Sequence, residues 1–72
     1  MIVLYSRRDC PLCEEVEDTL AALGIAYQFV DIDLDEELRK KYHVLVPVIK
    51  NTEHNAELCF PFTQDEIMQI VT

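Results

Sequence analysis

The stretch YSRRDCPLCEE, residues 5–15, contains two cysteines separated by two residues, with a proline directly after the first. A nearly all-apolar run, residues 2–5, leads into it, as is typical of a strand buried on both faces. Pro11 suits the first position of a helix, because its φ is already near the helical value and its missing N–H needs no partner there. The pattern predicts a strand, a short loop and a helix that begins at or just after Cys10.

This arrangement predicts different environments for the two thiols. Cys10 would lie at the helix N-terminus, where unpaired N–H groups and the positive end of the helix dipole stabilise a thiolate. Cys13 would lie one turn later, close enough to form an intramolecular disulfide. Such a pair can carry out thiol–disulfide exchange: the Cys10 thiolate attacks a substrate disulfide, and Cys13 then resolves the mixed disulfide. We therefore expect Cys10 and Cys13 to be the catalytic residues.

Two arginines precede this dithiol in an otherwise acidic chain. The protein has 14 acidic and 6 basic residues, and its formal net charge is −8. One hypothesis is that Arg7 and Arg8 offset this negative background locally and help to bind an anionic substrate. The alternative is that they are solvated loop residues, and the sequence favours neither interpretation.

Length and composition predict one globular domain. The chain has 72 residues, half of them apolar, with a single glycine and no low-complexity run, so we expect one domain over residues 1–72. No apolar run is long enough to cross a bilayer, and the first residues lack the pattern of a signal peptide. We therefore expect a cytoplasmic monomer. The net charge argues against nucleic acid as a partner, and we expect no membrane partner.

The remaining sequence predicts a succession of further elements. Leu12, Val16, Leu20 and Leu23 form an apolar stripe along the first helix, and Gly24 is suited to end it. The later elements are a strand at 26–32, a helix from a cap at Asp33 with Leu34, Leu38 and Tyr42 on one side, a strand at 45–50, a turn at 51–55, a strand at 56–60, and a last helix opened by a capping box at 63–66.

The order of these elements is βαβ, then α, then ββα. A strand–helix–strand unit implies two parallel strands joined by a right-handed crossover. The last two strands are close in sequence and imply an antiparallel hairpin. We therefore expect an α/β fold with a mixed sheet.

These features resemble the glutaredoxins of the thioredoxin-fold superfamily, of the CPxC dithiol type. The resemblance rests on Tyr5-Ser6-Arg7, on Cys10-Pro11-Leu12-Cys13, on Val46-Pro47 and on the element order, and it covers nearly the whole chain. The sequences VDID at 30–33 and CFPF at 59–62 are similar to a compact glutaredoxin-like branch. The resemblance implies a thioredoxin-like (glutaredoxin-type) βαβ-α-ββα three-layer sandwich with a four-stranded mixed sheet.

The resemblance also implies roles for individual residues. Cys10 becomes the nucleophile and Cys13 the resolving thiol. Pro47 becomes a cis-proline facing the active site, although X–Pro bonds are trans by default. Val46 would offer backbone groups to an extended substrate, and Arg7 stands where glutaredoxins often carry a lysine that meets the glutathione carboxylate. The expected substrate-binding residues are Arg7, Arg8, Pro11, Leu12, Val46 and Pro47.

The chain departs from glutaredoxins at the glutathione site. Leu12 replaces an aromatic residue, Leu45 replaces a threonine, and residues 60–63 replace a Gly-Gly pair with its following acid. Those glycines let the backbone approach the γ-glutamyl end of glutathione, which Pro61 and a bulky neighbour prevent. We expect no bound cofactor. The expected substrate is a disulfide-containing protein or a small thiol compound, and the reductant is either glutathione or a flavoprotein reductase such as thioredoxin reductase.

Two other interpretations are open. A structural zinc site needs four ligands, usually in two close pairs, whereas this chain has one such pair and the scattered Cys59, His43 and His54. We therefore expect no metal, and an iron–sulfur cluster held with glutathione is disfavoured for the same reason as glutathione itself. Cys59 is expected to be a buried strand residue. The second alternative is a redox-inactive binding module that has kept the fold.

Overall fold

The computed structural model describes residues 1–72 and has the predicted order of elements. Its helices and strands are β1 (Ile2–Ser6), α1 (Pro11–Ala22), β2 (Gln28–Asp31), the short 3₁₀ helix η1 (Ile32–Leu34), α2 (Glu36–Tyr42), β3 (Val48–Asn51), β4 (Ala56–Cys59) and α3 (Gln64–Val71). The strands form one sheet in the order β2-β1-β3-β4. β1 and β2 are parallel, whereas β3 is antiparallel to both β1 and β4. The predicted mixed four-stranded sheet is confirmed.

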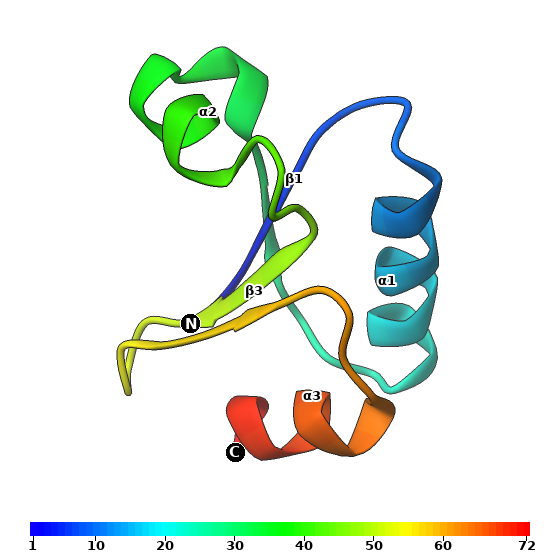
Figure 1. Ribbon diagram of the computed structural model, residues 1–72. Helices are drawn as coiled ribbons and strands as arrows, with labels where there is room; N and C mark the ends of the chain where they lie inside the picture. Colours follow the sequence, from blue (N-terminus) through cyan, green and yellow to red (C-terminus); the bar gives the residue numbers. More distant parts are fainter.

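Helices cover both faces of this sheet. α1 and α3 pack on one face, and η1 and α2 lie on the other side of β1 and β3 (Figure 1). Successive residues of a strand point to opposite faces, so on β3 Ile49 faces α1 and α3, whereas Val48 faces α2. The result is the expected three-layer sandwich. None of its helices is both long enough and apolar enough to cross a membrane.

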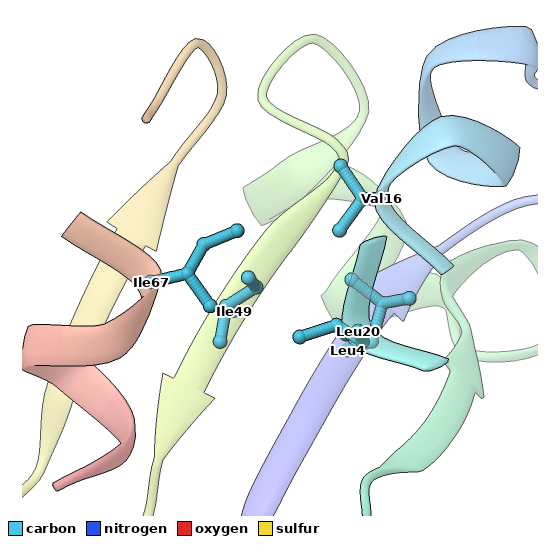
Figure 2. Packing of buried hydrophobic residues seen from close by; sticks show 5 residues of the cluster. All are labelled: Leu4, Val16, Leu20, Ile49 and Ile67. Atoms are coloured by element: carbon cyan, nitrogen blue, oxygen red, sulfur yellow. The ribbon is translucent and has the colours of Figure 1, made fainter. Parts of the chain in front are cut away.

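The main core lies between the sheet and the pair α1 and α3. Figure 2 shows its five buried side chains pointing toward one another from four different elements. They are Leu4, Val16, Leu20, Ile49 and Ile67. Leu4 and Ile49 are direct partners across β1 and β3, so the two central strands and the two helices share one apolar contact region.

Two predicted helix boundaries are confirmed. Gly24 follows α1 with a φ of 70°, in the left-handed region that glycine adopts without strain. Before α3, the hydroxyl of Thr63 accepts from the N–H of Glu66, and the Glu66 carboxylate accepts from the N–H of Thr63. This is the predicted capping box.

The prediction for the start of α2 is wrong. Asp35 caps the helix instead of Asp33, and its carboxylate accepts from the N–H groups of Glu37 and Leu38. The expected strand also ends early, because the Asp31 side chain accepts from the N–H of Asp33 and turns the chain into η1. Leu34 is therefore 82% exposed and does not belong to the apolar side of α2.

Three smaller expectations also need correction. Leu12 is exposed, and Cys13 takes its place among the buried residues of α1. The third strand begins at Val48 instead of residue 45, because the preceding amides donate to the carbonyl of Tyr42 instead of pairing with a strand. Cys59 is exposed. It lies at the end of the edge strand β4, whose alternate residue Leu58 faces the main core.

Tyr42 anchors α2 to the other face of the sheet. Its ring is 2% exposed and stacks on Tyr5, with 4.7 Å between the ring centroids. Its hydroxyl donates to Oε1 of Glu57 at 2.5 Å, and the ammonium groups of Lys41 and Lys50 each lie 3.9 Å from the same oxygen. Burial, and then the bond to Glu57, raise the pKa of Tyr42 well above its usual value.

Shortening a leucine of the main core should destabilise the protein far more than shortening an exposed one. We expect Leu20→Ala to lower the free energy of unfolding by about 2–5 kcal/mol, because it leaves a cavity between α1 and the sheet. The matched control Leu34→Ala should change it by less than about 0.5 kcal/mol. Urea titrations followed by circular dichroism measure both, and equal losses would contradict the assignment of the core.

Tyr42 should make the protein sensitive to alkali. Because the pKa of Tyr42 is raised in the folded protein, the tyrosine of the unfolded chain ionises first as the pH rises. The contribution of Tyr42 to the free energy of unfolding is therefore fully present below about pH 10 and is lost as the pH rises further. Tyr42→Phe should cost about 1 kcal/mol at pH 7, from the lost bond to Glu57, and its stability should fall less steeply above pH 10.

Urea unfolding at neutral and at alkaline pH measures this effect. Tyr5→Phe is the control at neutral pH, because its hydroxyl has no hydrogen bond in the structure and its removal should cost less. The interpretation fails if Tyr42→Phe and the parent lose stability equally between pH 10 and pH 12.

Candidate active site

A four-residue loop carries the chain from β1 into α1. Asp9, next to last in the loop, has a φ of 57°, a left-handed conformation that aspartate tolerates better than most residues. Cys10 follows in an extended conformation as the N-cap of α1, and Pro11 is the first helical residue. This turn places Cys10 at the helix N-terminus, as the sequence predicted.

The two cysteines of the motif are joined by a disulfide, and their Cα atoms lie 5.2 Å apart. The N–H of Cys13 donates to Sγ of Cys10 at 3.2 Å. In the reduced protein the same N–H, together with the helix dipole, stabilises a thiolate at Cys10. Cys13 is 1% exposed, whereas Cys10 is half-buried. Cys10 is therefore the more accessible of the two cysteines.

Both arginines of the loop are paired with acids at the end of β2 or just after it. Nη2 of Arg7 lies 2.7 Å from Oδ1 of Asp33, and its Nε donates to Oδ2 at 3.2 Å. Its third nitrogen, Nη1, donates to the carbonyl of His43 at 3.3 Å. Arg8 is much more exposed, and its Nε lies 3.7 Å from the carboxylate of Asp31. Arg7 thus joins the loop to η1 and to the end of α2.

Sequence reasoning missed Asp31 and Asp33 as partners of these arginines. A usable signal was present in the predicted topology. β1 and β2 are parallel, with Ser6 opposite Asp31, so the residues that follow the two strands meet at one edge of the sheet. Parallel pairing alone therefore brings residues 7–8 close to residues 31–33.

The segment before β3 reaches the same edge. Tyr5 is paired with Val48 in antiparallel β1 and β3, so Pro47 lies beside the end of β1. The Val46–Pro47 peptide bond is cis, as the resemblance implied. The N–H of Val46 donates to the carbonyl of Tyr42 at 3.1 Å. Substrate docking at Val46 would therefore have to use its carbonyl or displace this bond.

Exposed apolar side chains occur within the motif and in the segment before β3. Leu12 is exposed on the first turn of α1, and Leu45 is exposed just before the cis peptide bond. The side chain of Val44 is more exposed than either. Pro11 is exposed as well. A shallow cleft of about 470 Å³ beside the loop is lined by Arg7, Arg8, Asp9, Glu14, Glu17 and Phe29. The surface near Cys10 is therefore partly apolar and partly charged.

Residues 60–62 occupy the region where glutaredoxins have glycines. Phe60 and Phe62 pack edge to face, with 5.7 Å between ring centroids, and both contact the main core. The Phe60–Pro61 peptide bond is also cis. The rings of Phe60 and Phe62 line a groove of about 230 Å³ between α1 and α3. The segment thus has bulky side chains built into the core. The structure gathers no group of three His, Cys, Asp or Glu side chains that could hold a metal ion.

Known proteins share this architecture and sequence pattern. The family model described as glutaredoxin-like domain (DUF836) matches residues 1–70. The N-acetyl-S-hydroxy-L-cysteine reductase of Bacillus subtilis (strain 168) is 39% identical over 54 residues, which cover 68% of this chain and 58% of that protein. The chain thus spans less than two thirds of that relative.

Solved structures agree with the fold. The protein XcR50 from X. campestris is 33% identical, with a TM-score of 0.86, and the match covers 99% of this chain and 95% of that one. The thioredoxin-like protein BC3987 has a TM-score of 0.74 at 21% identity, over 97% of this chain and 99% of that one. The fold is therefore thioredoxin-like, as expected.

The two sulfurs of the reduced protein should differ strongly in reactivity. In a Cys59→Ser background, we expect iodoacetamide to modify Cys10 at least about tenfold faster than Cys13, because Cys10 is accessible and its thiolate is stabilised. Mass spectrometry of timed digests measures both rates. Equal rates, or faster modification of Cys13, would contradict this assignment of the two sulfurs.

Proposed function

The chain belongs to the glutaredoxin-like domain family (DUF836), and we propose that it is a thiol–disulfide oxidoreductase that works through Cys10 and Cys13. The observation that carries this proposal is the dithiol itself. It forms a disulfide at a helix N-terminus, with one sulfur accessible and the other buried. The reductase name of the B. subtilis relative supports the same chemistry.

The reaction begins from the reduced dithiol. The Cys10 thiolate attacks one sulfur of a substrate disulfide, a bond forms between Cys10 and that sulfur, and the substrate's own S–S bond breaks to release the first thiolate. Cys13 loses its proton and attacks Sγ of Cys10, which releases the second thiolate and forms the Cys10–Cys13 disulfide. Two electrons pass to the substrate, and a thiol or flavoprotein reductant returns two electrons to the protein.

Neighbouring groups support these steps. The N–H of Cys13 donates to Sγ of Cys10 and so favours the thiolate both before attack and when Cys10 is the leaving group. The exposed side chains of Leu12 and Leu45 and the half-buried Val46 offer apolar contacts to a substrate chain, whereas Pro47, at the cis peptide bond, is buried. Docking through backbone hydrogen bonds near a half-buried but accessible cysteine suits a disulfide-containing protein as substrate.

The electron donor we propose is a flavoprotein reductase of the thioredoxin reductase type, with glutathione as the alternative. Phe60 and Phe62 stand where glutathione-binding glycines are expected, and both are packed against the core. We further propose that the protein acts in electron transport as a cytoplasmic monomer without a bound cofactor. A reducing compartment would keep the exposed Cys59 as a thiol.

A sulfenic acid is a second candidate substrate, favoured by the printed name of the relative, which is an S-hydroxycysteine reductase. The same dithiol suffices for this reaction. The Cys10 thiolate attacks the sulfur of R–SOH, forms the mixed disulfide and displaces hydroxide, which leaves as water after protonation. Cys13 then releases the thiol R–SH and forms the internal disulfide.

Substitution of each cysteine should separate the two steps. Cys10→Ser should lose at least about 1,000-fold in the rate of reduction of a protein disulfide, since the accessible thiolate of the dithiol is lost. Cys13→Ser should attack the disulfide but accumulate a covalent mixed disulfide, visible by non-reducing electrophoresis. Cys59→Ser is the matched control and should keep the parent's rate.

Insulin disulfides serve as substrate, and glutathione with its reductase or thioredoxin reductase regenerates the dithiol in parallel assays. Full activity of Cys10→Ser would refute the mechanism. A folded parent protein that is inactive with both regenerating systems and in the stoichiometric reaction of its reduced form would instead favour the redox-inactive binding module.

A further inference from the structure

Arg7 has all three of its side-chain nitrogens engaged within the protein. Nη2 and Nε form a two-pronged contact with both carboxylate oxygens of Asp33, at 2.7 and 3.2 Å, and Nη1 donates to the carbonyl of His43 at 3.3 Å. This is the geometry in which a guanidinium group binds a carboxylate most specifically. An acid of the chain itself therefore occupies the carboxylate-binding side of Arg7.

Arg7 lines the cleft beside the loop together with Asp9 and Glu14, the residues on either side of the dithiol motif. Arg7 precedes Cys10 by three residues in the same loop, so their Cα atoms are at most about 11 Å apart. The bond from Arg7 to the carbonyl of His43 also brings the guanidinium beside the segment that leads to Val46 and Pro47. A small disulfide that reacts at Cys10 and extends into this cleft would bring its own charged groups to Arg7.

The contact between Arg7 and Asp33 is open to competition. The side chains are 30% and 44% exposed, respectively, and exposed ion pairs are weak and exchange with solvent. A carboxylate of a substrate would offer Arg7 the same two oxygens, but it would have to displace Asp33 and accept the repulsion of that displaced charge. A neutral group would meet no such competition.

We propose that Asp33 is a specificity-determining residue: by occupying the guanidinium of Arg7, it disfavours disulfides that carry a carboxylate near their sulfurs and leaves neutral ones unhindered. This inference rests on the proposed disulfide reduction at Cys10. The Arg7–Asp33 pair would then select among small substrates by their charge. Removal of the Asp33 carboxylate should leave Arg7 free to bind a carboxylate of the substrate.

Two matched probes test the proposal in single turnovers, so that no additional reductant is needed. The fully reduced protein is mixed with dithiodiglycolate, which carries two carboxylates, or with its neutral bis-amide, which has the same shape. Two electrons pass from the dithiol to the probe, and the rate constant is read from quenched, alkylated samples. The readout is the ratio of the anionic to the neutral rate constant in each variant.

We expect this ratio to rise about fivefold in Asp33→Asn, since an exposed guanidinium–carboxylate contact of this kind has about that strength. Asp33→Ala should show a similar rise in this ratio, and it replaces Asp33→Asn in the test if Asp33→Asn folds poorly. Glu36→Gln is the charge-matched control: it removes one negative charge three residues further along the chain, from an exposed residue that takes part in none of the ion pairs, and its ratio should stay within about twofold of the parent's.

The gain should also require Arg7. The double variant Arg7→Met with Asp33→Asn should show no rise over Arg7→Met alone. An unchanged ratio in Asp33→Asn, an equal rise in Glu36→Gln, or a rise that persists without Arg7 would overturn the proposal. Equal slowing with both probes would show instead that Asp33 only positions the loop, which also overturns it. A parent that reduces neither probe nor a protein disulfide would refute the proposed function, whatever the ratios.

Discussion

The parallel pairing of β1 with β2, together with the antiparallel pairing of β1 with β3, determines where every group of the candidate site lies. β1 is an inner strand with partners on both sides. Its last residues stand opposite Asp31 on one side and the start of β3 on the other. The loop that follows β1 therefore meets η1 and the cis Val46–Pro47 segment at one edge of the sheet. Without this register, the loop that carries the dithiol and the arginines would not lie beside η1 and the segment before β3.

The packing of the helices keeps this edge in order. Leu4 and Ile49 lie side by side on the two central strands, and Val16 and Leu20 of α1 rest against them. The helix that carries the cysteines is thus held to the strand that precedes it. On the other face, Tyr42 fixes the end of α2 to the sheet, and from this end the chain runs directly into the cis Val46–Pro47 segment. The dithiol helix thus packs on the main core, whereas the segment before β3 is held by the smaller cluster around Tyr42.

The dithiol half of the site and the arrangement of elements could be predicted because they depend on local sequence. Pro11 after Cys10 marks the helix start, and the spacing of the two cysteines places both on its first turn. Gly24 and the capping box at Thr63 mark boundaries through backbone conformation and side-chain oxygens near in sequence. The prediction failed at Asp33 because Asp31 opens η1 before it and Asp35 opens α2 after it. Aspartate suits the N-cap role at each of these positions, so the sequence alone does not single out the ones that are used.

The sequence by itself determined the order of strands and helices, the position of the dithiol at a helix N-terminus, and the loss of the glutathione-type glycines at 60–63. These follow from the properties of single residues and their close neighbours. Only the tertiary structure decided that Arg7 binds Asp33 across 26 positions, that Cys59 is exposed, and that the amide of Val46 is already used by Tyr42. Such contacts depend on strand register and on which face of an element is covered, and therefore on the whole chain.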